Sequence, residues 1–147
     1  MIARLPRRRA GQATEDGLLD SLAQVSFALM AVLNRIGGEN DLSLTQLRVL
    51  AILRDRRVRM STLAEYLGLE KSTMSGLVER AEKRKLLVRS PSATDGRSME
   101  VSISRKGAGL ARRLEREIRE AVAPLTGRLR PSERGRLQAL LERMLGA

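Results

Sequence analysis

The chain has 147 residues, a length that suits one domain or one domain with a dimerisation extension. Lysine and arginine total 28 against 17 aspartate and glutamate residues, and the formal net charge of +11 favours a polyanionic partner over a basic surface that only confers solubility. Cysteine and histidine are absent, which excludes disulfides, thiolate zinc sites and the common catalytic constellations. We therefore expect no enzyme, no catalytic residue, no metal and no cofactor.

The amino terminus carries an arginine cluster. No apolar run follows Arg4, Arg7, Arg8 and Arg9, so the segment is not a secretory signal. It is either an arm that contacts phosphates or a frayed, solvated terminus. The longest fully apolar run, Phe27 to Leu33, is far shorter than the roughly 18 residues of a membrane span. We expect a cytoplasmic protein with no membrane partner.

Helical periodicity begins near the start of the chain. Apolar residues recur at helical spacing from Leu18 to Ile36, and Gly37 and Gly38 are expected to end this helix. Ser43 and Gln46 have capping-box spacing, which predicts the start of a second helix. Its apolar stripe is expected to comprise Leu47, Leu50, Ala51 and Leu53.

A third helix is expected after a basic connection that ends with Met60 in a very short strand. The capping-box spacing of Thr62 and Glu65 predicts that this helix opens at Ser61 or Thr62. Gly68 permits a tight turn after it. The inward-facing residues are expected to be Leu63, Ala64 and Leu67.

A fourth helix is predicted from Lys71 to Lys83. Its apolar residues fall at positions i, i+3, i+4 and i+7, so one face is expected to be buried. These residues are Met74, Leu77, Val78 and Ala81. Two short helices around a tight turn are typical of a helix-turn-helix.

The other side of the fourth helix is the candidate DNA-recognition surface. The expected DNA-binding residues are Lys71, Ser72, Thr73, Ser75, Gly76 and Arg80. Their small hydroxyl side chains would let the backbone sink into the major groove. Gly76 costs about 1 kcal/mol of helix stability relative to alanine, and close approach to DNA would explain it. The alternative is that Gly76 packs against a neighbouring helix.

A hairpin is expected next, with strands at Leu86 to Ser90 and Ser98 to Ile103. The second strand alternates apolar and polar residues, and Asp95 and Gly96 between the strands are a strong hairpin signal. Arg97, where the tip ends, can reach into the electronegative minor groove, with Asp95 orienting its guanidinium. A solvated hairpin arginine is the alternative.

Two further helical patterns follow the hairpin. The first stripe comprises Leu110, Leu114, Ile118 and Val122, and the second, after Pro131, comprises Leu137, Leu140, Leu141 and Met144. A lobe of residues 43–103 does not need these helices for its own core. We therefore expect residues 17–36 and 105–146 to form dimerisation helices, with a monomeric bundle as the alternative.

The fold class expected for residues 1–147 is mainly α with an α+β winged helix in a single domain. Residues 43–103 form the winged helix-turn-helix DNA-binding lobe, flanked by N- and C-terminal dimerisation helices.

This order of motifs resembles the MarR (multiple antibiotic resistance regulator) family of bacterial transcription factors. The matching segments are Leu63–Leu69, Ser72–Arg80, Asp95–Arg97 and Val101–Ser104. The resemblance extends from about Leu18 to the end of the chain. It implies a homodimer whose two lobes bind a pseudo-palindromic double-stranded DNA operator, with Arg97 in the minor groove.

One departure from the family pattern bears on specificity. Members often carry an arginine where this chain has Gly76. The resemblance therefore shifts the expected base and phosphate contacts toward Ser72, Thr73, Ser75 and Arg80.

The resemblance also implies that a small phenolic or other organic effector releases the DNA. One phenylalanine, one tyrosine and no tryptophan leave little material for an aromatic-lined pocket. The candidate effector pocket comprises Met30, Leu33, Asn34, Arg35, Arg48, Leu50 and Met60. These could equally be ordinary core and surface residues. The absence of cysteine excludes a thiol-sensing member.

The expected function is that of a sequence-specific DNA-binding transcriptional regulator. Repression is ranked first because it is the family's more common mode. The alternatives are a nonspecific nucleoid-type DNA-binding protein and a winged helix that binds other proteins.

Overall fold

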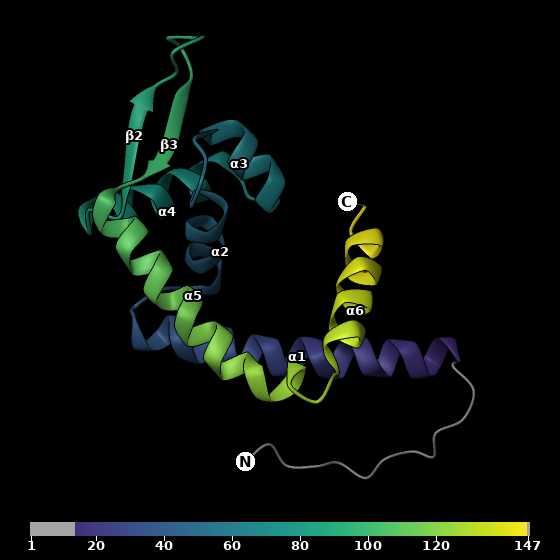
Figure 1. Cartoon of the computed structure of the whole chain (residues 1–147). Coiled ribbons are helices and arrows are strands. Elements are labelled where there is room, and N and C mark those ends of the chain that lie inside the picture. The colour runs from purple at the N-terminus through teal and green to yellow at the C-terminus, as the bar shows by residue number, and fades with distance from the viewer. Residues whose placement is uncertain (1–13, 147) are drawn as a thin grey trace. The chain divides into compact units, whose positions relative to one another are not determined.

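A computed structural model describes residues 14–146, so the arginine cluster from Arg4 to Arg9 lies outside the described residues. The chain forms two compact units, Met1–Ala31 and Val32–Ala147. Figure 1 shows the helices and strands that the described residues form. In chain order these are α1 (Glu15–Glu39), α2 (Leu44–Ile52), β1 (Val58–Arg59), α3 (Met60–Leu67), α4 (Lys71–Lys83), β2 (Leu87–Pro91), β3 (Met99–Ile103), α5 (Arg105–Thr126) and α6 (Pro131–Met144).

The first part of α1 exposes apolar side chains. Leu18, Leu19, Val25 and Phe27 are all more than half exposed. By length and composition alone α1 could cross a membrane, because its mean hydropathy reaches 1.4 over 18 residues. Counting only uninterrupted apolar runs missed this, since Asp20 and other polar residues interrupt the pattern. A helix whose apolar side packs against another helix has the same composition.

The expectation that Gly37 and Gly38 end α1 is wrong, because the helix continues through both to Glu39. It ends where Asp41 adopts a left-handed conformation with φ 53°. The N–H of Leu42 then donates to the Gly37 carbonyl at 2.8 Å, and that of Asp41 to the Gly38 carbonyl at 3.2 Å. Gly37 is buried, and a Cβ there would lie 2.6 Å from the Leu42 carbonyl oxygen. Close approach of the chain therefore explains this glycine.

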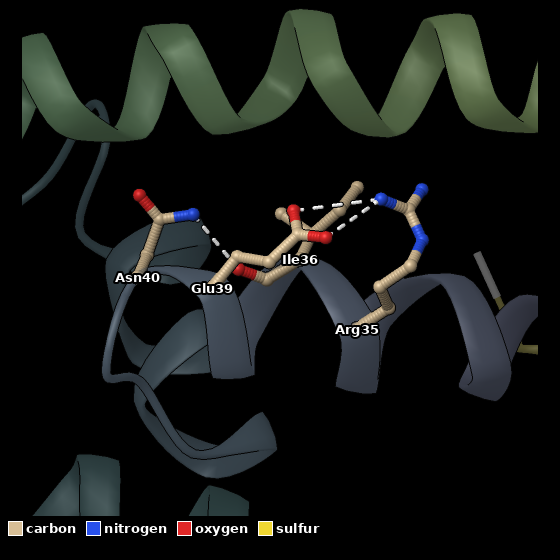
Figure 2. Close-up of polar contacts among 4 residues, drawn as sticks. All are labelled: Arg35, Ile36, Glu39 and Asn40. Carbon is tan, nitrogen blue, oxygen red and sulfur yellow. Dashed lines mark hydrogen bonds and ion pairs between the residues drawn. The ribbon is translucent and has the colours of Figure 1, made fainter.

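Asn40 holds the corner between α1 and α2. Its amide nitrogen donates to the Ile36 carbonyl at 2.8 Å, as Figure 2 shows. Its side-chain oxygen accepts a 2.7 Å hydrogen bond from Arg113 of α5. Arg84, which follows α4, donates to the backbone carbonyls of Asn40 and Asp41. The corner is thus bound to the end of α4 and to α5.

The capping box at the start of α2 is confirmed. Ser43 Oγ accepts from the N–H of Gln46 at 3.1 Å, and the Gln46 side chain accepts from the N–H of Ser43 at 2.9 Å. The expected stripe needs one correction: Ala51 is exposed and Val49 is buried in its place.

The capping box expected for α3 is absent. Helix α3 starts at Met60, its N-cap residue is Arg59, and no side chain caps it. Strand β1 sets this start, because Val58 and Arg59 pair with β3 and the helix follows directly. Met60 is therefore helical, contrary to the expectation. Gly68 ends α3 in the left-handed conformation, as the sequence predicted.

Helix α4 has the predicted bounds and the predicted buried face. Its apolar side chains join one hydrophobic core that includes residues from every other helix but α6. The most completely buried large side chains are Ile36, Val49, Leu53, Leu63, Met74, Val78 and Val101.

The sheet has the order β1-β3-β2, and both pairings are antiparallel. In β2 and β3, Leu87 pairs with Ile103 and Pro91 with Met99, so each strand starts one residue later than predicted. Met99 at the far end is exposed, because the hairpin extends beyond the core (Figure 1).

Helices α5 and α6 begin where the sequence predicted. Ser104 caps α5 by accepting from the N–H of Gly107 at 2.9 Å, and Pro131 is the first residue of α6. Leu114 of α5 is buried in the core, whereas no described residue of α6 is buried. In this unit α6 therefore presents an uncovered apolar side.

Substitutions at two glycines of α5 can test how closely this helix packs against the hairpin. A Cβ on Gly107 would overlap the Leu86 carbonyl oxygen and lie 2.9 Å from a side-chain carbon of Ile103. Gly109 has nothing within 4 Å of its Cβ position. We expect Gly107→Ala to lower the free energy of unfolding by about 1 to 3 kcal/mol. Gly109→Ala should raise it by up to about 1 kcal/mol through helix propensity.

The measurement is urea unfolding of both variants at one protein concentration, because association would shift apparent stability. Equal midpoints for the two variants would contradict the close contact between Gly107 and Leu86.

Candidate nucleic-acid interface

The predicted recognition residues lie on α4 away from the core. Lys71, Ser72, Thr73 and Arg80 are exposed, and Ser75 and Gly76 are partly exposed. The N-cap residue, Glu70, forms no side-chain hydrogen bond with the first turn. The backbone N–H groups of that turn can therefore bind an oxygen ligand such as a phosphate.

Gly76 lies on the open side of α4. A Cβ built on it would meet only a guanidinium nitrogen of Arg80, at 3.4 Å, among the described residues. That is ordinary contact with the end of a flexible side chain. The alternative that Gly76 serves to pack against a neighbouring helix therefore has no support.

A groove of about 320 Å³ lies between α4 and the hairpin. It receives the cations Lys71 from α4, Arg89 from β2 and Arg97 from the loop after β2. The other lining residues are Met60, Ser61, Ala64, Met74, Ser75, Ser98 and Met99. The groove is therefore a cationic surface with hydroxyl groups and an apolar floor.

The three cations differ in how their charge is balanced. Arg89 forms a 2.7 Å ion pair with Glu82. No carboxylate among residues 14–146 forms an ion pair with Lys71 or Arg97. These two charges can therefore act on an anion that enters the groove.

Asp95 shapes the hairpin loop through the backbone. Its carboxylate accepts from the N–H of Arg97 at 3.1 Å and from the Ser98 hydroxyl at 2.9 Å. These hydrogen bonds lower the pKa of Asp95, the one from Arg97 most strongly. The expectation that Asp95 orients the Arg97 guanidinium needs correction, because the carboxylate binds the peptide nitrogen of Arg97 instead. Gly96 lies exposed between the two residues.

A second network, which the sequence reading missed, supports the loop at its base. Ser92 is almost fully buried. Its hydroxyl donates a hydrogen bond to the Glu100 carboxylate of β3 at 3.0 Å and forms a second one with the Thr94 hydroxyl at 3.2 Å. Glu100 also lies 3.9 Å from Arg57, just before β1. Arg89 was missed as well. Its place in β2 gave no local signal, since only the pairing of the strands and the position of α4 bring it into the groove.

The candidate effector residues lie in different surroundings. Leu50 is buried in the core and Leu33 packs partly against it. Arg48 is exposed and stacks on the Tyr66 ring at 5.3 Å from its centre. Met60 lines the groove beside α4.

The remaining candidates are on α1. Met30 and Asn34 are exposed. Arg35 forms a 3.2 Å ion pair with Glu39 one turn along the helix, and Figure 2 shows its guanidinium turned toward that carboxylate. Both Arg35 and Arg48 are thus engaged on the protein's own surface, and the effector pocket stays a hypothesis.

Comparisons with known proteins agree with this geometry. Residues 40–98 match the model of the MarR family. A search of curated proteins found no match. Among solved structures, NadR in complex with 4-hydroxyphenylacetate is 21% identical, with 95% of this chain and 97% of that chain covered and a TM-score of 0.71.

Two further structures show the same likeness. Wild-type MarR from E. coli in its apo form is 20% identical over 92% of this chain and 99% of that chain, with a TM-score of 0.73. A MarR-family transcriptional regulator from Rhodococcus sp. RHA1 is 20% identical over 91% and 97%, with a TM-score of 0.75. The resemblance read from the sequence is confirmed: residues 40–98 match the MarR family, and the chain as a whole has the fold of solved MarR-family regulators.

Proposed function

We propose that this chain is a DNA-binding transcriptional regulator that binds a short inverted repeat in duplex DNA as a homodimer and represses transcription. The observation that carries the proposal is the groove in which Lys71, Arg89 and Arg97 meet between α4 and the hairpin. A duplex offers phosphates along both sides of each groove, so cations on two elements can bind one site together.

The two elements fit different grooves of DNA. The outward side of α4 carries small hydroxyl residues and Gly76, which allow its backbone to come close to base edges in the major groove. Arg97 is exposed at the end of the hairpin loop, where an arginine suits a narrow and electronegative minor groove. The net charge of +11 supports the same partner.

The homodimer is supported by apolar surface that a single chain leaves uncovered. Helix α6 exposes Leu137, Leu140, Leu141 and Met144, and a groove of about 370 Å³ runs beside it. A two-fold dimer matches half-sites about one helical turn apart.

We further propose that a small organic acid releases this chain from DNA. Its support is the fold shared with NadR, which was solved with 4-hydroxyphenylacetate. We expect 4-hydroxyphenylacetate or a related phenolic acid to bind this chain and to weaken its affinity for DNA. Calorimetry with a series of phenolic acids tests this, and no heat of binding together with unchanged DNA affinity would remove the effector from the proposal.

Arg97→Ala tests the wing contact. We expect the variant to lose about 1 to 3 kcal/mol of binding free energy for a fragment selected from genomic DNA, without loss of folding, because the minor-groove cation is gone. Fluorescence anisotropy over a range of salt concentrations measures it. The salt dependence should become shallower by about one phosphate contact.

Arg119→Ala is the matched control, because it removes the same charge from α5, where Arg119 pairs with Glu115. Full affinity after Arg97→Ala would contradict the minor-groove contact of Arg97. If the wild type bound the selected fragment and a scrambled one with equal affinity, the nonspecific nucleoid-type function would be favoured.

The homodimer predicts that two chains of the wild type bind each inverted repeat.

Gly76→Ala separates close approach to DNA from helix packing. The substitution should stabilise the fold by up to about 1 kcal/mol, since the new methyl group meets only the Arg80 side chain. It should at the same time weaken operator binding, because the methyl group stands between the α4 backbone and the DNA. Thermal unfolding and anisotropy on the same samples test both effects. A variant that is stabilised and binds as tightly as the wild type would show that α4 does not approach DNA at Gly76.

A further inference from the structure

One carboxylate joins the recognition helix to the hairpin. Glu82, near the end of α4, contacts Arg89 of β2 twice. One carboxylate oxygen accepts from the backbone N–H of Arg89 at 3.1 Å, and the other pairs with its guanidinium at 2.7 Å. Among residues 14–146 this is the only ion pair between α4 and either strand of the hairpin.

The surroundings of this pair favour a structural restraint over a surface ion pair. The side chains of Arg89 and Glu82 are 33% and 26% exposed, whereas those of Lys83 and Glu79 on the same helix are 72% and 55% exposed. Less solvent screens the Arg89 pair, and the hydrogen bond that Glu82 accepts reaches the backbone of the neighbouring strand. Glu82 therefore restrains the strand itself and not only a side chain.

Arg89 sits where a restraint acts on the whole hairpin. It pairs in register with Val101 of β3, which is completely buried in the core. Beyond this pair only Ser90 and Pro91 remain before the loop that carries Arg97. The position of the loop relative to α4 thus depends on the attachment at Arg89.

We propose that Glu82 is a positioning residue for DNA recognition, which sets the spacing between the major-groove side of α4 and the minor-groove arginine, Arg97. The inference rests on the proposed function. Both contacts have to reach their grooves in one binding event, so a wing that is free to shift loses part of the benefit of Arg97. The negative charge of Glu82 is balanced by the Arg89 guanidinium that it contacts.

A double-mutant cycle on the full chain tests the proposal. Glu82→Ala, Arg97→Ala and the double variant are measured by anisotropy on the selected fragment and on a scrambled one. We expect Glu82→Ala to lower the ratio of specific to scrambled affinity about three- to tenfold, and to shrink the effect of Arg97→Ala by a similar factor. Glu82→Gln, which keeps an oxygen for the Arg89 N–H but loses the charge, should fall between the wild type and Glu82→Ala.

Asp55→Ala is the control, because it removes one carboxylate from an exposed ion pair with Arg56, on the connection between α2 and β1. It should leave the affinity ratio and the effect of Arg97→Ala unchanged. If Glu82 acted through its charge alone, Glu82→Ala would raise both affinities together and would leave the full effect of Arg97→Ala. That result would overturn the proposal while the proposed function stands.

The restraint of β2 by Glu82 can also be tested without DNA, and so independently of the proposed function. Hydrogen exchange at the Arg89 amide should be faster in Glu82→Ala than in the wild type or in Asp55→Ala, because the acceptor of this amide is gone only in Glu82→Ala. Unchanged exchange would overturn the restraint. A wild type that shows no sequence preference would overturn the proposed function and the recognition role of Glu82, but not the restraint that exchange reports.

Discussion

Helix α4 buries Met74, Leu77, Val78 and Ala81 almost completely, and the groove between α4 and the hairpin depends on that burial. A close-packed core leaves a helix little freedom to rotate or slide, so the opposite side of α4 is held in one orientation. The structure adds polar attachments to this packing. Glu82 holds β2, and the residue that follows α4, Arg84, binds the corner between α1 and α2. Packing and polar contacts thus place α4 and the hairpin together.

The groove beside α4 combines balanced and unbalanced positive charges. Arg89 is paired with Glu82, whereas Lys71 and Arg97 have no carboxylate partner among the described residues. The paired Arg89 contributes little to the positive field that attracts a polyanion, but it fixes the position of β2 relative to α4. Lys71 and Arg97 contribute more to that field and do not attach α4 to the hairpin. In the proposed complex, Lys71 and Arg97 therefore attract DNA, and Arg89 sets the spacing of the contacts.

The corner at Asn40 connects this groove to the remainder of the second unit. Asn40 accepts a hydrogen bond from Arg113 on α5, and its backbone accepts one from Arg84. A movement of α5 would therefore act on the end of α4 through two short contacts. Helix α6 contributes no buried residue, so its apolar side is available to another chain.

The sequence by itself determined the local features of this protein. The bounds and buried face of α4, the capping box of Ser43, the turn at Gly68 and the Pro131 start of α6 all depend on residues within one or two turns. Periodicity and capping report such short-range preferences directly. The family resemblance came from the same local motifs in their order.

Tertiary structure decided the rest, because long-range contacts overrode local preference. Strand pairing set the start of α3 at Met60 and left the Thr62 spacing unused. The close approach of Leu42 requires a glycine at position 37, inside α1 and not at its end. Arg89 of β2 lines the groove and is held by Glu82 of α4, and only the fold brings these two elements together. No spacing along the chain encodes a contact whose distance depends on how two elements pack.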